Sequence, residues 1–225
     1  MAFPEALSWA AAGGHSECMA LAIQLVDPAR HAADYLEALR ISAACGHVSC
    51  ARLLIPLVDP KADGSLALIV AAEHGFHDCV ESLIPVSDPL VSAGMPLRLA
   101  ARHGHVDCVR LLAPVSDPAA ESSMALIWAA QNGHADCVAL LAPVGNPAAF
   151  HFLALQLAIQ RERSLCSAIL IPFMDGLSAD VLFAASEDAR ANGREAAEAF
   201  FLSFAEKASM LAEQSRAEPK GPLRM

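Results

Sequence analysis

The chain has 225 residues, 55% of them hydrophobic, and a mean hydropathy of +0.41. Its apolar runs fall well short of the ~18 residues that a membrane-spanning helix needs, so we expect no membrane segment. A formal net charge of −10 without a basic patch argues against nucleic acid and anionic lipid as partners. The N-terminus does not resemble a secretory signal and the seven cysteines are an odd number, which predicts reduced thiols and a cytoplasmic protein.

Cysteine, glycine and an Asp-Pro pair recur along the chain at one common interval of 29 residues. The members are Cys50, Cys79, Cys108, Cys137 and Cys166; Gly46, Gly75, Gly104 and Gly133; and Asp59, Asp88, Asp117, Asn146 and Asp175, the last without its Pro. An earlier copy, with Gly14, Cys18 and Asp27, is offset by 32 residues. Because such a period is typical of stacked supersecondary units, the pattern predicts a repeat solenoid instead of one globular core.

Each copy is predicted to form two antiparallel helices joined by a tight turn. In the fifth copy, Asp117 and Pro118 favour the start of a helical turn, since Asp is a good N-cap and Pro suits the first helical position. Helix-forming residues then run to Gly133, which suits the left-handed conformation that ends many helices. The second helix carries Cys137 and closes near Pro143.

In chain order, the six predicted repeats are residues 1–27, 28–59, 60–88, 89–117, 118–146 and 147–176. Three extra residues near 32–35 predict a protruding loop in the second repeat. In the sixth, Glu162 and Arg163 replace the turn Gly and His, so we expect the stop of its first helix to be lost. Residues 177–215, with helices at 178–191 and 194–215, are predicted to form a helical C-terminal cap, and residues 216–225 a disordered tail.

Residues 94–112 resemble an ankyrin repeat. The residues shared with that family's pattern are Pro96, Leu97, Ala100, Ala101, Gly104, His105, Val109, Leu111 and Leu112, whereas Met95, Arg98 and Cys108 depart from it. The resemblance covers about residues 5–175. The present unit is four residues shorter than the ankyrin unit of about 33 residues, and the missing part is the β-hairpin finger. The resemblance therefore implies an all-α, ankyrin-like helical repeat solenoid with little or no hairpin finger.

The regular column of cysteines favours packing over chemistry. Equivalent positions in adjacent repeats lie roughly 8–10 Å apart, whereas zinc ligands lie within ~2.3 Å of one ion. We therefore predict no metal site, no cofactor and no catalytic residue. The column is interpreted as small buried hydrophobes, and Cys45, which lies outside it, as the most exposed thiol.

Two further columns are assigned to structure. The ankyrin resemblance implies that the histidines after the turn glycines hold the turns by hydrogen bonds; these are His15, His47, His105 and His134. Trp9 and Trp128 occupy one repeat position beside the paired alanines, and we predict that they pack against neighbours rather than stack on a ligand.

The two positions before each turn glycine vary from copy to copy while the core positions stay fixed. In ankyrin repeats these positions lie on the concave face, so the resemblance implies a partner-binding stripe there. Its members in the third to sixth repeats are Glu73, His74, Arg102, His103, Gln131, Asn132, Gln160 and Arg161. A face that is merely solvated would vary in the same way, and the helix at 194–215 is a rival binding element.

The resemblance implies a non-catalytic protein–protein interaction module that acts as a monomer and binds a partner protein through the concave face. One alternative is a bacterial effector that is delivered into a host cell and binds a host protein. Ankyrin-like arrays are used in that way, and an N-terminus without a cleavable signal is compatible with such export. A metal- or redox-active protein is the least favoured alternative.

Overall fold

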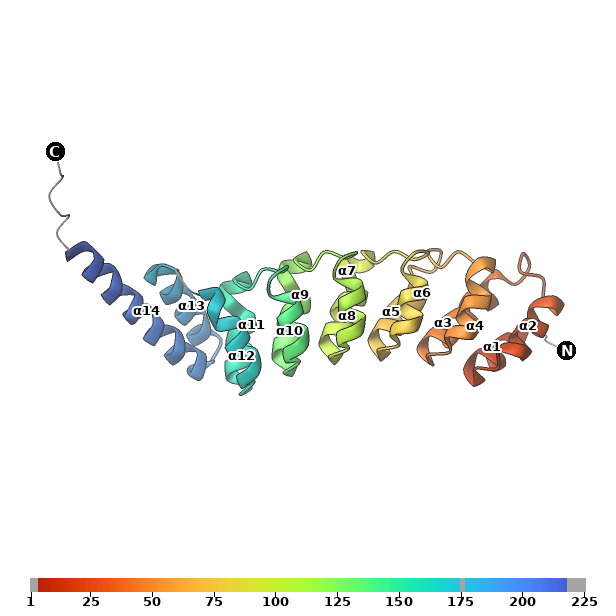
Figure 1. Ribbon diagram of the computed structural model, residues 1–225, viewed down its shortest axis with the longest axis horizontal. Coiled ribbons are helices and arrows are strands. Elements are labelled where there is room, and N and C mark those ends of the chain that lie inside the picture. Colours follow the sequence, from red (N-terminus) through yellow and green to blue (C-terminus); the bar gives the residue numbers. More distant parts are fainter. Residues whose placement is uncertain (1–3, 175–176, 218–225) are drawn as a thin grey trace, which may run out of the picture.

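The computed structural model describes residues 4–174 and 177–217; residues 218–225, within the predicted tail, lie outside this part. In the described ranges the chain forms fourteen α-helices, two short 3-10 helices and no β-strand. The helices stack side by side in an elongated solenoid (Figure 1). The prediction of an all-α repeat solenoid without hairpin fingers is therefore confirmed. No helix of the described ranges combines the length and the apolar character needed to cross a membrane.

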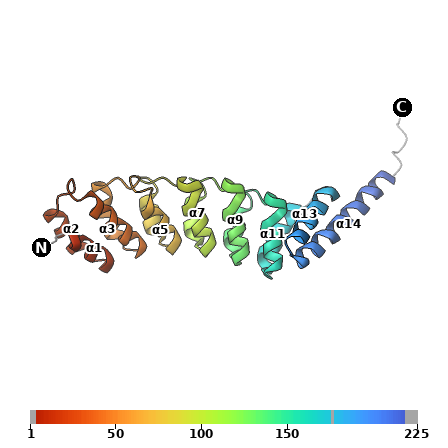
Figure 2. The same cartoon turned by 180° about the vertical axis from the view of Figure 1, so that it is seen from behind.

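Six helix pairs build the stack, and their helices lie in two layers, of which Figure 2 shows the first in front. The first layer contains α1 (Pro4–Gly13), α3 (Ala32–Ala44), α5 (Leu66–His74), α7 (Val91–His103), α9 (Ala120–Asn132) and α11 (Ala149–Gln160). The second contains α2 (Ser16–Leu25), α4 (Val48–Leu54), α6 (His77–Leu83), α8 (Val106–Leu112), α10 (Ala135–Leu141) and α12 (Ser164–Leu170). The 3-10 helices η1 (Ile55–Leu57) and η2 (Ile171–Met174) follow α4 and α12, and α13 (Ala179–Ala191) and α14 (Glu195–Ala217) end the stack.

Each of the five junctions between consecutive repeats contains the capped turn that the Asp-Pro pattern predicts. A side-chain oxygen of the first residue accepts a hydrogen bond from the backbone N–H two residues further on, at 3.0–3.1 Å. The five residues that do so are Asp27, Asp59, Asp88, Asp117 and Asn146. Asn replaces Asp in the fifth of these turns because both side chains place an acceptor oxygen in the same position.

A short left-handed segment takes the place of the ankyrin finger between this turn and the next helix. It comprises Ser92–Gly94 in the fourth repeat, with φ from 49° to 72°, and residues 150–152 in the sixth, with φ from 48° to 64°. Residues other than glycine pay about 1–2 kcal/mol each for this conformation. In the fifth repeat Ser123 has φ of 65°, and its hydroxyl accepts a hydrogen bond from the N–H of Asn146 at 2.6 Å. This bond joins consecutive repeats and offsets part of the strain.

The turn glycines are required for two separate reasons. Gly104 ends α7 with φ of 76°, a conformation that L-residues rarely adopt. In addition, a Cβ added at Gly104 would lie 2.4 Å from the imidazole of His134 in the next repeat. A Cβ added at Gly75 would lie at the same distance from the imidazole of His105. The glycine therefore also makes room for the side chain that joins two repeats.

Three side chains of the histidine column form hydrogen bonds next to the turn of the preceding repeat, so the turn-holding role that the ankyrin resemblance implies acts between repeats. Ring Nε2 atoms donate to backbone carbonyls 32 to 35 residues earlier, at 2.9–3.2 Å. The pairs are His47 with Ala12, His105 with Glu73, and His134 with Arg102. His15 belongs to the first repeat and makes no such bond in the described structure. The column therefore couples neighbouring turns along the stack.

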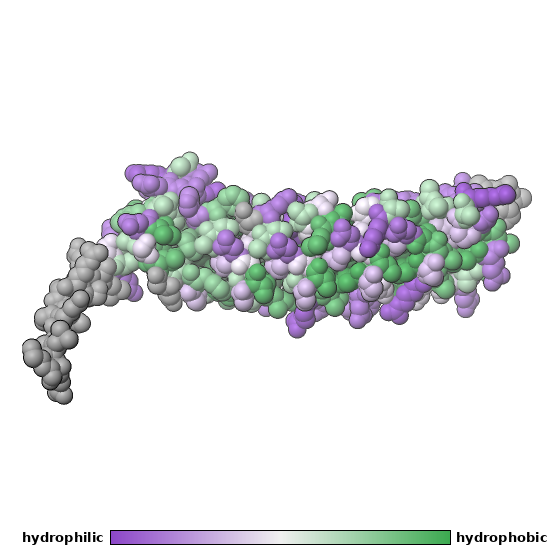
Figure 3. All heavy atoms as spheres, turned by 90° about the horizontal axis from the view of Figure 1, so that it is seen from above, coloured by the Kyte–Doolittle hydropathy of each residue, from purple (hydrophilic) through white to green (hydrophobic). Residues whose placement is uncertain are grey.

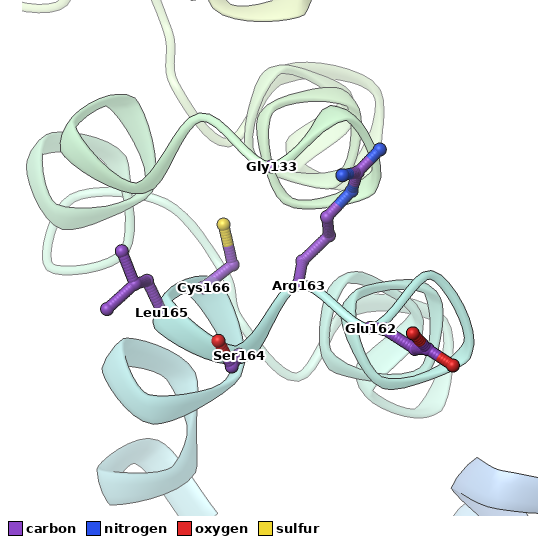
Figure 4. A pocket seen from close by; sticks show the side chains of 6 residues that line it. All are labelled: Gly133, Glu162, Arg163, Ser164, Leu165 and Cys166. Atoms are coloured by element: carbon purple, nitrogen blue, oxygen red, sulfur yellow. The ribbon is translucent and has the colours of Figure 1, made fainter.

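In the sixth repeat the first helix stops at the usual place without a glycine, so the prediction of a lost stop is wrong. Helix α11 ends at Gln160, Glu162 adopts φ of 56°, and the N–H of Arg163 donates to the carbonyl of Ala158 at 2.8 Å. Glu162 is exposed, and its side chain points away from those of Ser164, Leu165 and Cys166 (Figure 4). Arg163 extends across Gly133, where the other repeats place a ring.

The three extra residues of the second repeat are helical, so the predicted protruding loop is also wrong. They form the first turn of α3, which begins at Ala32. Tyr35 in this turn is fully buried, and its hydroxyl donates a hydrogen bond to the carbonyl of Val26 at 2.7 Å. Burial of this ring holds the inserted residues against the end of α2 instead of leaving them in solvent.

The C-terminal helices form the predicted cap. Helices α13 and α14 pack against each other and against α11. Phe201 of α14 is fully buried, with its ring centroid 6.1 Å from that of Phe152. The buried amide of Gln156 accepts a hydrogen bond from Arg194 at 2.6 Å and donates one to Asp188 at 3.2 Å. These contacts fasten the cap to the last repeat by both apolar and polar groups.

Candidate interaction surface

The predicted stripe lies along one edge of the first helix layer. Its eight residues are the last two of α5, α7 and α9, then Gln160 at the end of α11 and the adjacent Arg161. Consecutive helices of this layer pack side by side, so these residues form a continuous line across four repeats (Figure 2). Glu73 and Gln131 are half-buried, and the other six are exposed. The stripe is therefore accessible to a partner.

Trp128 is the centre of a cation–π cluster beside this stripe. The guanidinium carbons of Arg98 and Arg102 lie 5.1 Å and 5.7 Å from the centroid of its ring, within the ~6 Å range of this interaction. The side chain of Arg98 is only 11% exposed and forms an ion pair with Glu121 at 2.7 Å. Arg102 is exposed and forms no ion pair with any described residue. The charge of Arg98 is thus neutralised by Glu121 within the protein, whereas the guanidinium of Arg102 faces solvent.

The backbone of Arg102 is fixed by the following repeat. The side-chain amide of Asn132 donates to the carbonyls of Arg102 and Trp128, at 3.1 Å and 3.0 Å. His134 donates a second hydrogen bond to the Arg102 carbonyl at 3.0 Å. The arginine is therefore anchored through its backbone and supported through its side chain, so binding to it would cost little ordering entropy.

The histidines of the stripe are also held by their neighbours. His74 Nδ1 donates to the carbonyl of Val70 at 2.8 Å, and its ring stacks on Phe76 with centroids 6.2 Å apart. His103 stacks on His105 at 6.0 Å. Burial, followed by the charge of Arg102, lowers the pKa of His103 below its ordinary value. The neutral form of His103 is therefore favoured.

Charge on the stripe is uneven. From Arg102 to Arg161 it contains two arginines and no carboxylate, and Glu73 is its one acidic member. Across the turns, the second-layer helices α6, α8 and α10 carry an aspartate in the first turn; these are Asp78, Asp107 and Asp136. The cationic part of the stripe is therefore bordered by an acidic row on the other layer.

A second exposed surface follows the edge of the longer loops. Figure 3 shows apolar residues gathered over this edge, and Leu90, Val115 and Val144 are among the exposed ones. Asp88 and Asp117 also lie here, and one oxygen of each accepts a hydrogen bond in a capped turn. This edge therefore exposes apolar side chains beside charged ones, whereas the stripe carries an exposed arginine that its neighbours hold in place.

Sequence reasoning missed Arg98 and misjudged one tryptophan. Trp128 packs against the core as predicted, but Trp9 is 77% exposed, so the packing prediction is wrong for the first repeat. The available signal for the cluster was the four-residue spacing of Arg98 and Arg102 on one helix, with an aromatic residue one repeat after Leu99.

The cysteines have the environment of packing residues. The five members of the 29-residue column are 0–1% exposed, as predicted, and burial raises the pKa of Cys79, Cys108 and Cys137 to about 11. Cys45 is exposed, also as predicted, but Cys18 of the first repeat is exposed too. In the described part of the chain, no three His, Cys, Asp or Glu side chains lie close enough together to hold a metal ion.

The fold and this surface define a helical repeat solenoid of the kind that serves as a protein-interaction scaffold. The family model for ankyrin repeats (3 copies) matches residues 7–92, 39–122 and 97–181. These matches cover well over half of the 225 residues, so the chain belongs to the ankyrin repeat family. Ankyrin repeats are in general protein–protein interaction modules.

One of the sixteen solved chains that match is the ankyrin repeat domain of human ASB11. It is 21% identical over 77% of this chain and 84% of that chain, with a TM-score of 0.62. At this identity the similarity shows the fold alone. No curated protein sequence matches the chain.

Proposed function

We propose that this chain recognises a partner protein through the stripe, on the concave face of the stack, and that it acts as a monomeric scaffold without catalysis. The observation that carries the proposal is Arg102, which is exposed at the middle of the array, anchored by Asn132 and His134, and supported by Trp128. Interface energy concentrates in a few such residues, among which Arg and Trp are enriched.

The experiment compares partner capture by the full chain and by variants. Arg102→Ala combined with Gln131→Ala should weaken capture at least tenfold, which corresponds to about 1.4 kcal/mol. Loss of the exposed cation–π contact should cost only about 0.5–1 kcal/mol of stability, so the variant should remain folded. Captured proteins are identified by affinity purification with mass spectrometry, and a thermal melt of each variant accompanies the measurement.

Two control variants test whether the loss of capture is specific to the stripe. Arg110→Ala removes an exposed arginine of the same repeat from the second layer and should leave capture unchanged. Glu206→Ala combined with Lys207→Ala alters exposed residues of α14, the rival element. If capture survives the stripe variant but is lost with the α14 variant, the cap is the binding element and the proposal is wrong.

A further inference from the structure

The part of the stripe formed by the fourth to sixth repeats differs in charge from the chain as a whole. The chain has a formal net charge of −10. Between Arg102 and Arg161, however, the six stripe positions hold two arginines and no carboxylate. Electrostatic complementarity favours partners of opposite charge and suppresses those of like charge. An acidic segment would therefore be repelled by most of the molecule and attracted to this strip.

Arg102 has the geometry of a carboxylate receptor. Its guanidinium lies over Trp128, with 5.7 Å between the guanidinium carbon and the ring centroid, and stacking of this kind leaves the N–H groups at the edge of the guanidinium available. A carboxylate can accept two parallel hydrogen bonds from that edge. The neighbouring Arg98 cannot serve in the same way, because it is largely buried and paired with Glu121.

We infer that the fourth to sixth repeats bind an extended acidic segment of the partner protein, with one carboxylate on Arg102 and a second near Arg161. This inference rests on the proposed function of the stripe and names the chemistry of its partner. The two arginines lie two repeats apart, roughly 20 Å at the usual helix spacing. An extended chain covers about 3.3 Å per residue, so its two acidic residues should be about six positions apart.

The side chains between the two arginines suit such a segment. Gln131 is the residue before the last of α9, and Gln160 is the last of α11. Both carry amides that can donate to a backbone carbonyl or a side chain of an extended peptide. Asn132 already donates to Arg102 and Trp128, which leaves its side-chain oxygen as an acceptor for a backbone N–H. The acidic row at Asp107 and Asp136 borders this path and would keep an acidic segment on the first layer.

The test selects ligands without assuming their sequence. The full chain is used to select from displayed random peptides of about 12 residues, long enough to span ~20 Å when extended. Parallel selections use Arg102→Gln and the control Arg110→Gln, whose arginine lies on the second layer. We expect the wild type and Arg110→Gln to enrich peptides rich in Asp and Glu, and Arg102→Gln to lose that enrichment.

The strongest selected peptide is then synthesised and titrated. The chain has two tryptophans, so in a Trp9→Phe background the fluorescence of Trp128 alone reports binding beside Arg102. Arg102→Gln should weaken binding at least tenfold. The acidic residues of the peptide are also replaced by their amides one at a time, and one of these changes should weaken binding by a similar factor. That change and Arg102→Gln together should not be additive, because they remove the same contact.

The outcomes separate this inference from the proposed function. Neutral or apolar peptides that bind the wild type and are lost with Gln131→Ala, but not with Arg102→Gln, contradict the acidic segment and keep the stripe as a binding surface. Peptides that bind the wild type, Gln131→Ala and Arg102→Gln equally well contradict both the inference and the proposed function. Failure to enrich acidic peptides on the wild type also overturns the inference.

Discussion

The first and fifth repeats carry the same residue types at two equivalent positions but expose them differently. Trp9 is 77% exposed, whereas Trp128 packs against the core beneath two arginines. Cys18 is exposed, whereas Cys137 is fully buried. The side chains within one repeat are therefore not enough to determine burial. Side chains of the neighbouring repeat are also needed to cover the tryptophan and the cysteine.

The two ends of the described stack show the same dependence. At the C-terminal end, α13 and α14 cover α11 and bury Phe152 and Phe201. At the other end, α1 packs against α2, α3 and α4, and its outer side borders an open hollow of about 550 Å³ lined by Ala6, Trp9 and Cys18 among others. In a solenoid each unit contacts only its neighbours, and within residues 4–174 and 177–217 the first repeat has a neighbouring repeat on one side only.

The largest effect should come from breaking a contact between neighbours at a turn glycine. Gly104→Ala forces a Cβ into the left-handed region and against the ring of His134 at 2.4 Å, so we expect a loss of about 3 kcal/mol or more. The matched variant Gly193→Ala also has positive φ, but no atom lies within 4 Å of the added Cβ, and it should cost about 1 kcal/mol. Urea unfolding measures both. Equal losses would mean that the neighbour adds nothing.

Thiol labelling should separate the exposed Cys18 of the first repeat from the buried Cys137 of the fifth by about 100-fold. At pH 8, a pKa of about 11 for Cys137 reduces the reactive thiolate by about that factor relative to an ordinary thiol, and burial slows access further. Cys18 and Cys45 should react first with N-ethylmaleimide in the native protein, as read by mass spectrometry. Labelling of Cys18 as slow as that of Cys137 would show that its face is covered in solution.

Fluorescence quenching should show a smaller, several-fold difference between the two tryptophans. Trp9 is measured in a Trp128→Phe variant and Trp128 in a Trp9→Phe variant, each with acrylamide as the quencher. We expect stronger quenching of Trp9 because its ring is 77% exposed, while Arg98 and Arg102 cover the ring of Trp128. Similar quenching constants would contradict the arginine cluster.

The smallest effect concerns the protonation of His103. Burial and then Arg102 lower its pKa below 6.5, so the unfolded chain binds this proton more readily and stability falls as the pH drops below about 6.5. Arg102→Gln removes one cause, so the pKa of His103 should rise and this loss of stability should shrink. A histidine titration by NMR measures the shift. An unchanged pKa would mean that Arg102 does not lie near His103 in solution.

The sequence period was enough to predict the helix pairs, the buried cysteine column and the glycine turns, because these depend on local conformation and on a core that repeats. It was not enough where a side chain acts on another repeat. His134 bonds to the carbonyl of Arg102, and Arg98 meets Trp128, through contacts about 30 residues apart. Glu162 ends a helix with positive φ because its side chain reaches open solvent. These contacts and conformations depend on the space and the polar groups that the adjacent repeat offers to each side chain.

Hydrogen exchange of the full chain with and without its captured partner tests the central claim most directly. If the stripe is the binding surface, the amides slowed by the partner should lie at the turns after α7, α9 and α11, around residues 102–106, 131–135 and 160–164. Those of the loop edge and of α14 should keep their rates. Slowing confined to α14, with unchanged exchange at the three turns, would contradict the account.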